Sequence, residues 1–366
     1  MTDEATRRRG KKAMGATAGL SAGGFRLMLV SIPFLTSCVE PNPSTNSMAP
    51  SDDSARAMEC LKAALGYDAN PAVRVQAVEA LQDAGDPEVL PWIRSALLDE
   101  HPGVRFAACL AVGRNRDAGA SAGLSKCLSD ADPSVRLAAI YAQHRLGRTE
   151  RTGELAGALI THRDAAVRRN AAFILGLLGE PGGVKVLAKA MKDPDAGVRQ
   201  HALEAMTRLG NAEAQQELSF RANSGVGADE LFAVSALAAC NDRALADSFR
   251  FKLENAAHIE TRLAAAKALG ALGDASGFQT AISALRSPKP STDTPDDPAP
   301  AQALRIQQLA AGALGAIRRP QALTDLRRVM DRSDDPRVQV SAAKAILEIR
   351  GSLSSSEEPF AQARRR

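Results

Sequence analysis

The chain has few aromatic residues, few cysteines and no long hydrophobic run. Aromatic side chains make up 4% of its 366 residues, and none of its five cysteines forms a Cys-x-x-Cys pair. Such pairs are typical of zinc, haem and redox-active sites, so these classes of protein are not indicated. The longest apolar stretch, Leu27 to Leu35, is far shorter than the roughly 20 residues that a membrane-spanning helix needs.

The sequence also lacks a basic excess outside its first residues. The formal net charge is +4, but residues 1–37 hold six basic and two acidic residues, which leaves 40 of each in the remainder. Proteins that bind nucleic acid use basic residues to neutralise phosphates and aromatic rings to stack on bases. We therefore expect no nucleic-acid partner.

Signals for metal binding and catalysis are weak. There are five histidines, and none is followed by glutamate, which argues against a His-Glu-x-x-His zinc site. We expect no metal, no cofactor, no small-molecule substrate and no enzyme activity.

What the sequence does contain is a short motif with a period of 31 residues. Asn70–Arg74 recurs as His101–Arg105 and again as Asp132–Arg136. The Val-Arg pair at its end can be followed through further copies, once a 14-residue insert at residues 287–300 is subtracted. These copies are Val167-Arg168, Val198-Arg199, the degenerate Asp229-Glu230, Thr261-Arg262, Ile306-Gln307 and Val338-Gln339. The count predicts nine repeats.

Each repeat is predicted to be a pair of antiparallel helices, with the second helix opening just before the Val-Arg pair. Proline in the first turn of a helix loses no hydrogen bond, and the polar residue before it can cap the helix. Second helices are therefore predicted to begin at Pro71, Pro102, Pro133 and Pro336. Glycines that suit a left-handed C-terminal cap follow twelve residues after the valine position. They are Gly85, Gly147, Gly179, Gly210 and Gly273.

Helix pairs this short cannot bury an apolar face alone, so neighbouring repeats must stack into one continuous core. We predict an all-α fold, an α-solenoid of about nine helix pairs over residues 54–350. The sixth repeat has lost both the proline and the arginine, and we expect it to form a weak junction.

The pattern resembles HEAT repeats, in particular the short HEAT-like units of phycobilisome lyases, whose consensus is similar to Asp-Pro-x-Val-Arg followed by alanines and Leu-Gly. The resemblance implies a structural ladder, in which aspartates six residues before the arginines pair with them within and between repeats. The residues concerned are Asp68, Arg74, Asp99, Arg105, Asp130, Arg136, Asp193 and Arg199. Similar HEAT-like hydroxylases bind iron through His-Glu pairs, which this sequence lacks.

The first 37 residues have the layout of a signal peptide, with basic residues before a short apolar stretch. The stretch runs into Leu35-Thr36-Ser37-Cys38, which resembles a bacterial lipobox. The resemblance implies lipidation of Cys38 and durable attachment to a membrane. We therefore expect an exported protein, lipid-anchored in the bacterial cell envelope and facing the periplasm or the exterior. The alternative is an ordinary signal peptide followed by a chance cysteine.

Three further segments and two cysteines can be assigned. Residues 38–53 are predicted to be a flexible tether, and residues 351–366 a disordered tail. The insert at 287–300 has five prolines, so it is either a flexible loop between helices or a docking segment. Cys109 and Cys127 fall at core positions, where we favour buried thiols over a disulfide.

In HEAT-like arrays the second helices line the concave side, and helical phase places Glu79 and its equivalents on that face. Three successive equivalents are large and apolar, namely Leu110, Tyr141 and Phe173. Clustered exposed apolar residues indicate an interface, so these three predict a partner-binding stripe on the concave face. The alternative is that a drift in superhelical phase buries them between repeats.

Together these observations predict a non-catalytic scaffold or adaptor that holds another envelope or membrane-associated protein on its concave face. Two alternatives stay open. One is a lyase-like protein or another enzyme subunit built on a HEAT-like fold, and the other is a structural array with no defined partner.

Overall fold

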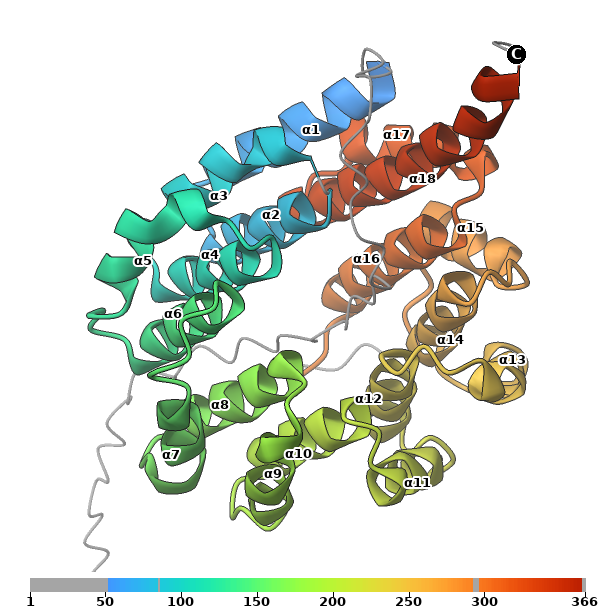
Figure 1. The fold of residues 1–366 in the computed structure, drawn as a ribbon. Coiled ribbons are helices and arrows are strands. Elements are labelled where there is room, and N and C mark those ends of the chain that lie inside the picture. Colours follow the sequence, from blue (N-terminus) through green and yellow to red (C-terminus); the bar gives the residue numbers. More distant parts are fainter. Residues whose placement is uncertain (1–51, 85, 292–295, 364–366) are drawn as a thin grey trace, which may run out of the picture. The chain divides into compact units, whose positions relative to one another are not determined.

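The computed structural model describes residues 52–363, apart from residue 85 and residues 292–295. This part of the chain forms eighteen α-helices and contains no strand (Figure 1). The predicted all-α solenoid of nine helix pairs is confirmed. The predicted signal peptide, Cys38 and nearly all of the predicted tether lie outside the described residues. No described helix has both the length and the hydrophobicity to cross a membrane.

Every repeat consists of a first helix, which we call helix A, and a second, helix B. The A helices are α1 (Asp52–Leu65), α3 (Leu90–Ala96), α5 (Ser121–Cys127), α7 (Gly153–Thr161), α9 (Val184–Ala190), α11 (Ala212–Arg221), α13 (Ala246–Asn255), α15 (Phe278–Arg286) and α17 (Leu323–Arg332). The B helices are α2 (Pro71–Asp83), α4 (Pro102–Arg114), α6 (Pro133–Arg145), α8 (Ala165–Leu178), α10 (Ala196–Arg208), α12 (Gly227–Ala238), α14 (Ile259–Ala271), α16 (Ala299–Ile317) and α18 (Pro336–Ala363).

The prolines, capping residues and glycines lie at the helix ends where the sequence predicts them. Four B helices begin at the predicted prolines, and the residue before proline caps the helix. The side chain of Asn70, for example, accepts the N–H of Ala72 at 2.9 Å. Four of the five glycines are left-handed, as a C-terminal cap requires. They are Gly147, Gly179, Gly210 and Gly273, with φ between +74° and +86°, and Gly85 lies outside the described residues.

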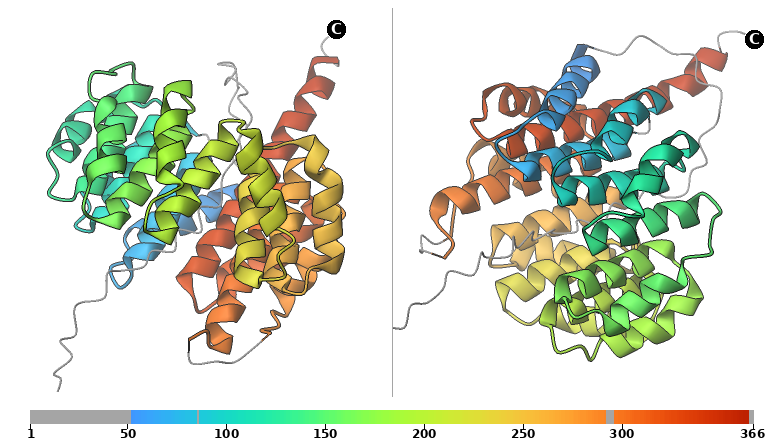
Figure 2. Two further views of the ribbon diagram at one scale, coloured as in Figure 1. Left: turned by 90° about the horizontal axis from the view of Figure 1, so that it is seen from below. Right: turned by 90° about the vertical axis from the view of Figure 1, so that its left-hand side faces the viewer.

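Consecutive B helices pack side by side and form an inner layer, while the A helices cover them on the outside (Figure 1; Figure 2 gives two further views). Many alanines of the B helices are fully buried. Alanine permits close approach of two helix backbones and has the highest helix propensity. The alanine-rich sequence of the B helices therefore explains why they form the inner layer.

The last repeat packs against the first, so the array is closed. Helix α18 contacts both α1 and α2 (Figure 1). Ion pairs link these two repeats at several points, which we call the seam. They are Asp83 with Lys344 at 2.6 Å, Arg56 with Asp331 at 2.7 Å, Asp53 with Arg327 at 3.4 Å, and Asp53 with Arg350. Every repeat consequently has two neighbours.

The structure departs from the predicted boundaries at the insert. Helix α15 ends at Arg286 and helix α16 begins at Ala299, seven residues before Ile306. Gln302 on α16 is buried; its side chain accepts the N–H of Ser291 and donates to the carbonyl of Asp297. Both sides of the insert are thereby fastened to α16.

The structure also differs at the C-terminal end, where we predicted a disordered tail from residue 351. Helix α18 continues to Ala363. This helix packs against α1, α2, α16 and α17. Residues 364–366 lie outside the described part.

Candidate functional site: the inner face of the array

The predicted stripe on the inner face is interrupted at its centre. Leu110 and Phe173 are partly exposed, but Tyr141 is only 2% exposed. The Tyr141 ring lies against Gly113 of the preceding repeat, where an added Cβ would fall 2.6 Å from a ring carbon. The predicted exposure of Tyr141 is therefore wrong, because the glycine on α4 leaves room for the ring between two B helices.

Phe173 sits in a mixed aromatic and charged environment. The His201 ring meets it edge-on at a centroid distance of 6.5 Å, and the Arg208 guanidinium carbon lies 5.9 Å from its centroid. Arg208 in turn donates to Glu204 at 2.6 Å. A cation near the ring face is attracted by its quadrupole, so Phe173 is held in place while part of the ring stays accessible.

A cluster of charged side chains lies on the inner face close to the seam. Lys344 on α18 contacts Asp83 at 2.6 Å and Glu348 at 3.7 Å. Glu79 on α2 and Lys267 on α14 interact electrostatically with this pair. We call Glu79, Asp83, Lys267, Lys344 and Glu348 the charged cluster.

Gly315 on α16 makes room for the charged cluster, and Gly312 lies beside it. An added Cβ at Gly312 would lie 3.9 Å from the Lys267 ammonium, and one at Gly315 would collide with the Glu348 carboxylate. Long side chains from α14 and α18 can therefore extend over α16. Lys267, Gly312 and Lys344 occupy the Glu79 position in the last three repeats, so the sequence already contains a signal for part of this cluster.

Two groups of the cluster have strongly shifted pKa values. Desolvation raises the pKa of the Glu79 carboxyl to about 7, against an opposing effect of Lys344. Desolvation also lowers the pKa of the Lys267 ammonium to about 7, and the nearby charge of Lys344 lowers it further. Titratable groups poised near neutral pH in a concave surface are characteristic of functional sites, although structural charge networks produce them too.

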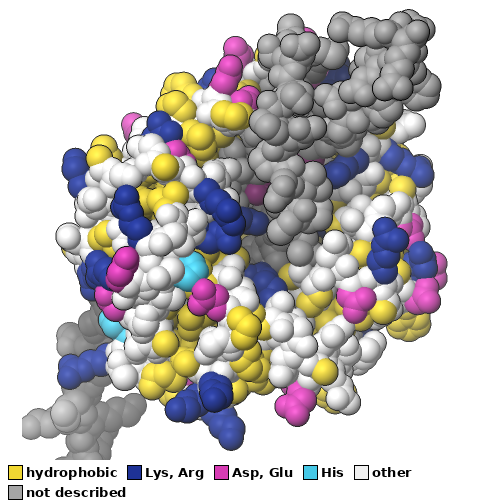
Figure 3. All heavy atoms as spheres, in the orientation of Figure 1, with side chains coloured by type: hydrophobic (Ala, Val, Ile, Leu, Met, Phe, Trp, Pro, Cys, Tyr) yellow, Lys and Arg dark blue, Asp and Glu magenta, His cyan; other side chains and the backbone are white. Residues whose placement is uncertain are grey.

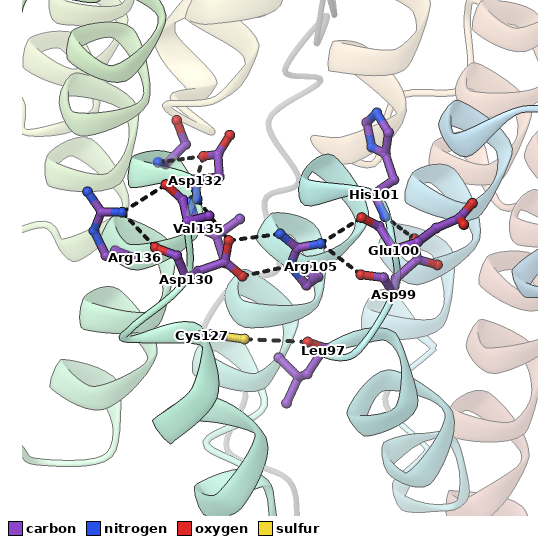
Figure 4. A network of polar contacts seen from close by, with 12 residues as sticks. Leu97, Asp99, Glu100, His101, Arg105, Cys127, Asp130, Asp132, Val135 and Arg136 are labelled. Carbon is purple, nitrogen blue, oxygen red and sulfur yellow. Dashed lines mark hydrogen bonds and ion pairs between the residues drawn. The ribbon is translucent and has the colours of Figure 1, made fainter.

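The ladder joins successive repeats through forked ion pairs (Figure 4). Arg105 binds both carboxylate oxygens of Asp130 through Nε and Nη2, at 2.7 and 2.8 Å, while its Nη1 donates to the carbonyls of Asp99 and Glu100. Arg74 binds Asp99 of the next repeat in the same forked way. Such bidentate pairs are geometrically specific and fix the register of neighbouring repeats.

The ladder has one rung that we did not predict. Arg168 binds Asp193 of the next repeat through Nε and Nη2, both at 2.8 Å. These hydrogen bonds hold the pKa of the Asp193 carboxyl below its usual range. The signal for this rung was present in the sequence as the fourth Val-Arg pair, Val167-Arg168, which our predicted ladder does not include.

Two predicted arginines do not form a rung. Arg136 and Arg199 donate through Nη1 to the backbone carbonyls of Asp130 and Asp193, respectively. The residue at the aspartate position of the following repeat is His162 for Arg136 and Ser224 for Arg199, so neither arginine meets a carboxylate there. Asp68 belongs to the first repeat, and the arginine position of the neighbouring ninth repeat holds Gln339, so that position supplies no arginine. The pKa of Arg74 is raised mainly by its hydrogen bond with Asp99, and the charge of Asp68 adds to this effect.

In the degenerate sixth repeat an acidic residue stands at the arginine position and pairs with a lysine of the next repeat. Glu230 stands at the arginine position of α12 and meets Lys252 of α13 at 3.2 Å. Both residues are buried, at 7% and 5% exposure. A charge pair therefore still links this repeat to the next one.

The described part of the chain shows no group of three or more metal-ligating side chains. Cys109 and Cys127 are buried free thiols, as predicted, and Cys127 donates to the carbonyl of Leu97.

The segment Gly119 to Gly123 has the Gly-x-Ser-x-Gly spacing of hydrolases. Its first two residues lie in a short 3-10 turn, Ala118–Ala120, and not at the end of a strand. Ser121 opens α5, and its hydroxyl donates to the Ala118 carbonyl. A nucleophile elbow needs a strand-to-helix turn, so this match is fortuitous.

Basic and acidic side chains alternate on the described part of the face shown in Figure 3, and hydrophobic side chains lie between them. This mixture agrees with the equal numbers of basic and acidic residues outside the first 37.

Comparison with known proteins agrees with this geometry. A family model described as HEAT repeats matches residues 58–143 and 154–238, and a model of the PBS lyase HEAT-like repeat matches residues 261–287. The chain carries HEAT repeats. The HEAT matches cover the ladder rungs at Arg74, Arg105 and Arg168, and the lyase-type match begins at Thr261, where the Val-Arg position of the seventh repeat falls.

Solved structures with similar HEAT-type folds are distant in sequence. Human deoxyhypusine hydroxylase in complex with glycerol is 18% identical over 81% of this chain and 97% of its own, with a TM-score of 0.37. The complex of CpcE and CpcF of phycocyanin lyase from a Nostoc species is 20% identical over 76% of this chain and 100% of its own, with a TM-score of 0.40. No curated protein sequence matches the chain.

Proposed function

We propose that this HEAT array is a non-catalytic interaction scaffold that holds another protein of the bacterial envelope against its inner face. The surroundings of Phe173 carry this proposal. Its partly exposed ring is framed by His201 and by the Arg208–Glu204 ion pair. An aromatic anchor inside a polar and charged rim is the typical composition of a binding hot spot.

The two accessible residues of the stripe provide the test. Leu110→Ala together with Phe173→Ala is expected to weaken capture of the partner by about 2 kcal/mol or more, because truncating central anchors removes most of their contact area. Binding is measured by quantitative pull-down from solubilised membranes.

A matched control for the double variant lies on the outer layer. Phe251 on α13 is an aromatic side chain with 57% exposure, and Phe251→Ala should leave capture unchanged. If the inner-face double variant keeps its helical content and still binds the partner fully, the inner face is not the interface.

We further propose that the protein is exported and lipid-anchored through Cys38. Cys38→Ser is expected to abolish acylation and leave an unprocessed or released protein, because no other residue of the lipobox-like segment offers a thiol. Mass spectrometry of the mature amino terminus checks this. A wild-type terminus at any other residue would refute the anchor.

The charged cluster favours a second candidate function, a subunit of an enzyme. Glu79 and Lys267, with pKa values both near 7, are suited to proton transfer at neutral pH. Loss of an associated activity in Glu79→Gln, with partner capture retained, would support this candidate over the scaffold.

A further inference from the structure

A cavity of about 150 Å³ lies where the ladder lacks an aspartate, between α6 and the helices of the fourth repeat. Its lining includes Arg136, Leu137 and Ile140 from α6, Glu154 and Ala158 from α7, and His162 after α7. The cavity therefore coincides with the ladder position at which Arg136 fails to meet a carboxylate.

The three complete rungs define what this position holds elsewhere. In each, the arginine Nε and Nη2 bind the aspartate of the next repeat. One oxygen of that aspartate also accepts the N–H two residues further on, as Asp130 does from Asp132 at 2.9 Å. The rung is thus a carboxylate held by a guanidinium fork and a backbone N–H.

Between the third and fourth repeats the arginine keeps its hydrogen bonds to the backbone. Arg136 Nη1 donates to the carbonyls of Asp130 and Ala131 at 2.6 and 3.1 Å, as Arg105 Nη1 does to Asp99 and Glu100. Because the complete rungs share this anchor and Arg136 lines the cavity, we infer that its Nε and Nη2 edge faces the fourth repeat as theirs do.

His162 takes over only part of the role of aspartate. Its Nδ1 accepts the N–H of Asp164 at 3.1 Å, which is the backbone hydrogen bond that aspartate makes in the other rungs. A neutral imidazole that accepts at Nδ1 carries its proton on Nε2. His162 therefore supplies a donor where aspartate would have supplied two acceptors.

We propose that this cavity binds the carboxylate of an acidic side chain from another protein. Arg136 would take the carboxylate through its Nε and Nη2 fork, as the ladder arginines take aspartate, and His162 Nε2 would add a third donor. Planar bidentate recognition makes arginine the preferred partner of carboxylates. The site lies at the turns between helices and is independent of the inner-face function proposed above.

The size and walls of the cavity select the ligand. Pockets for small molecules usually measure about 300 to 1,000 Å³, so a space of about 150 Å³ suits a single side chain. Leu137 and Ile140 offer apolar walls for the methylene groups of glutamate. The one lining carboxylate, Glu154, is held at 2.6 and 2.9 Å by Arg151.

The test is an NMR titration of the ¹⁵N-labelled full-length protein, observed at the arginine Nε–H signals. The probes are an acetylated, amidated Ala-Glu-Ala peptide, its Ala-Gln-Ala counterpart and sodium butyrate. We expect a saturable shift of the Arg136 signal with the glutamate peptide and none with the glutamine peptide. Tighter binding of butyrate than of the glutamate peptide would overturn the assignment to a protein side chain, in favour of a free carboxylic acid.

Variants make the assignment specific. Arg136→Lys keeps the charge but loses the fork, and is expected to weaken binding at least about tenfold. Arg199→Lys, at the other incomplete rung, should leave it unchanged. His162→Asp should complete the rung within the chain, and so abolish peptide binding while raising the melting temperature. Absence of a saturable shift in the wild type, or undiminished binding in folded His162→Asp, would overturn the proposal.

Discussion

Replacing Lys252 with methionine is expected to lower the free energy of unfolding by about 3 to 5 kcal/mol. Lys252 and Glu230 form a buried ion pair between α12 and α13. Methionine fills a similar volume but leaves the Glu230 carboxylate buried without its partner, and an uncompensated buried charge is strongly destabilising. Urea unfolding followed by circular dichroism measures the difference.

Two controls separate charge burial from other effects. The double variant Glu230→Leu with Lys252→Met removes both charges and should recover most of the lost stability. Arg221→Met breaks the exposed pair with Glu217 on α11 and should change little. Equal stability of Lys252→Met and wild type would mean that the pair does not secure this junction.

The other junction of the sixth repeat, which it forms with the fifth, bears on where the array opens. We predicted a weak sixth repeat, and α10 and α12 have the sparsest contact of any consecutive B helices. Hydrogen exchange is therefore expected to be fastest around α12 in the wild type. Lys252→Met should accelerate exchange there more than in α4 or α6.

Gly113→Ala is expected to destabilise the protein by about 2 to 3 kcal/mol, in spite of the higher helix propensity of alanine. The added Cβ would lie 2.6 Å from the Tyr141 ring and 2.9 Å from the Cα of Ala142. Tyr141 is too deeply buried to move aside, so α4 and α6 must separate. Thermal unfolding measures the effect.

Gly157→Ala is the matched control, because it makes the same change inside helix α7 with no atom within 4 Å of the new Cβ. This variant should gain up to about 1 kcal/mol from helix propensity. Opposite signs for the two substitutions would establish the close packing of Tyr141 on α4. A stabilised Gly113→Ala protein would contradict it and return Tyr141 to the candidate interface.

The repeat architecture was predictable because its determinants are local. Proline before Val-Arg, a capping side chain and a left-handed glycine each act within a few residues, and the 31-residue period copies them along the chain. The ladder was predictable only in part. Its rungs need an arginine in one repeat and an aspartate 25 residues later, and the repeats that follow Arg136 and Arg199 lack that aspartate.

The inner face was harder to predict because it depends on the exact superhelical phase. The burial of Tyr141 follows from a glycine in a neighbouring repeat, which no pattern within its own helix reveals. The seam was beyond reach, since Asp83 and Lys344 are 261 positions apart. The Glu230–Lys252 pair could not be predicted either, because the sequence does not show that these two charged side chains, both at degenerate positions, face each other.

Closure of the array constrains how it can move. In an open solenoid each junction can change its angle freely, and the displacement grows toward the ends. Here the rotations at all junctions must add up to the fixed total that lets Lys344 reach Asp83. If a partner bends the array at Phe173, other junctions must therefore rotate to compensate, or the seam must take up strain. Movements of distant repeats are thus mechanically linked, and no dedicated pathway between them is needed.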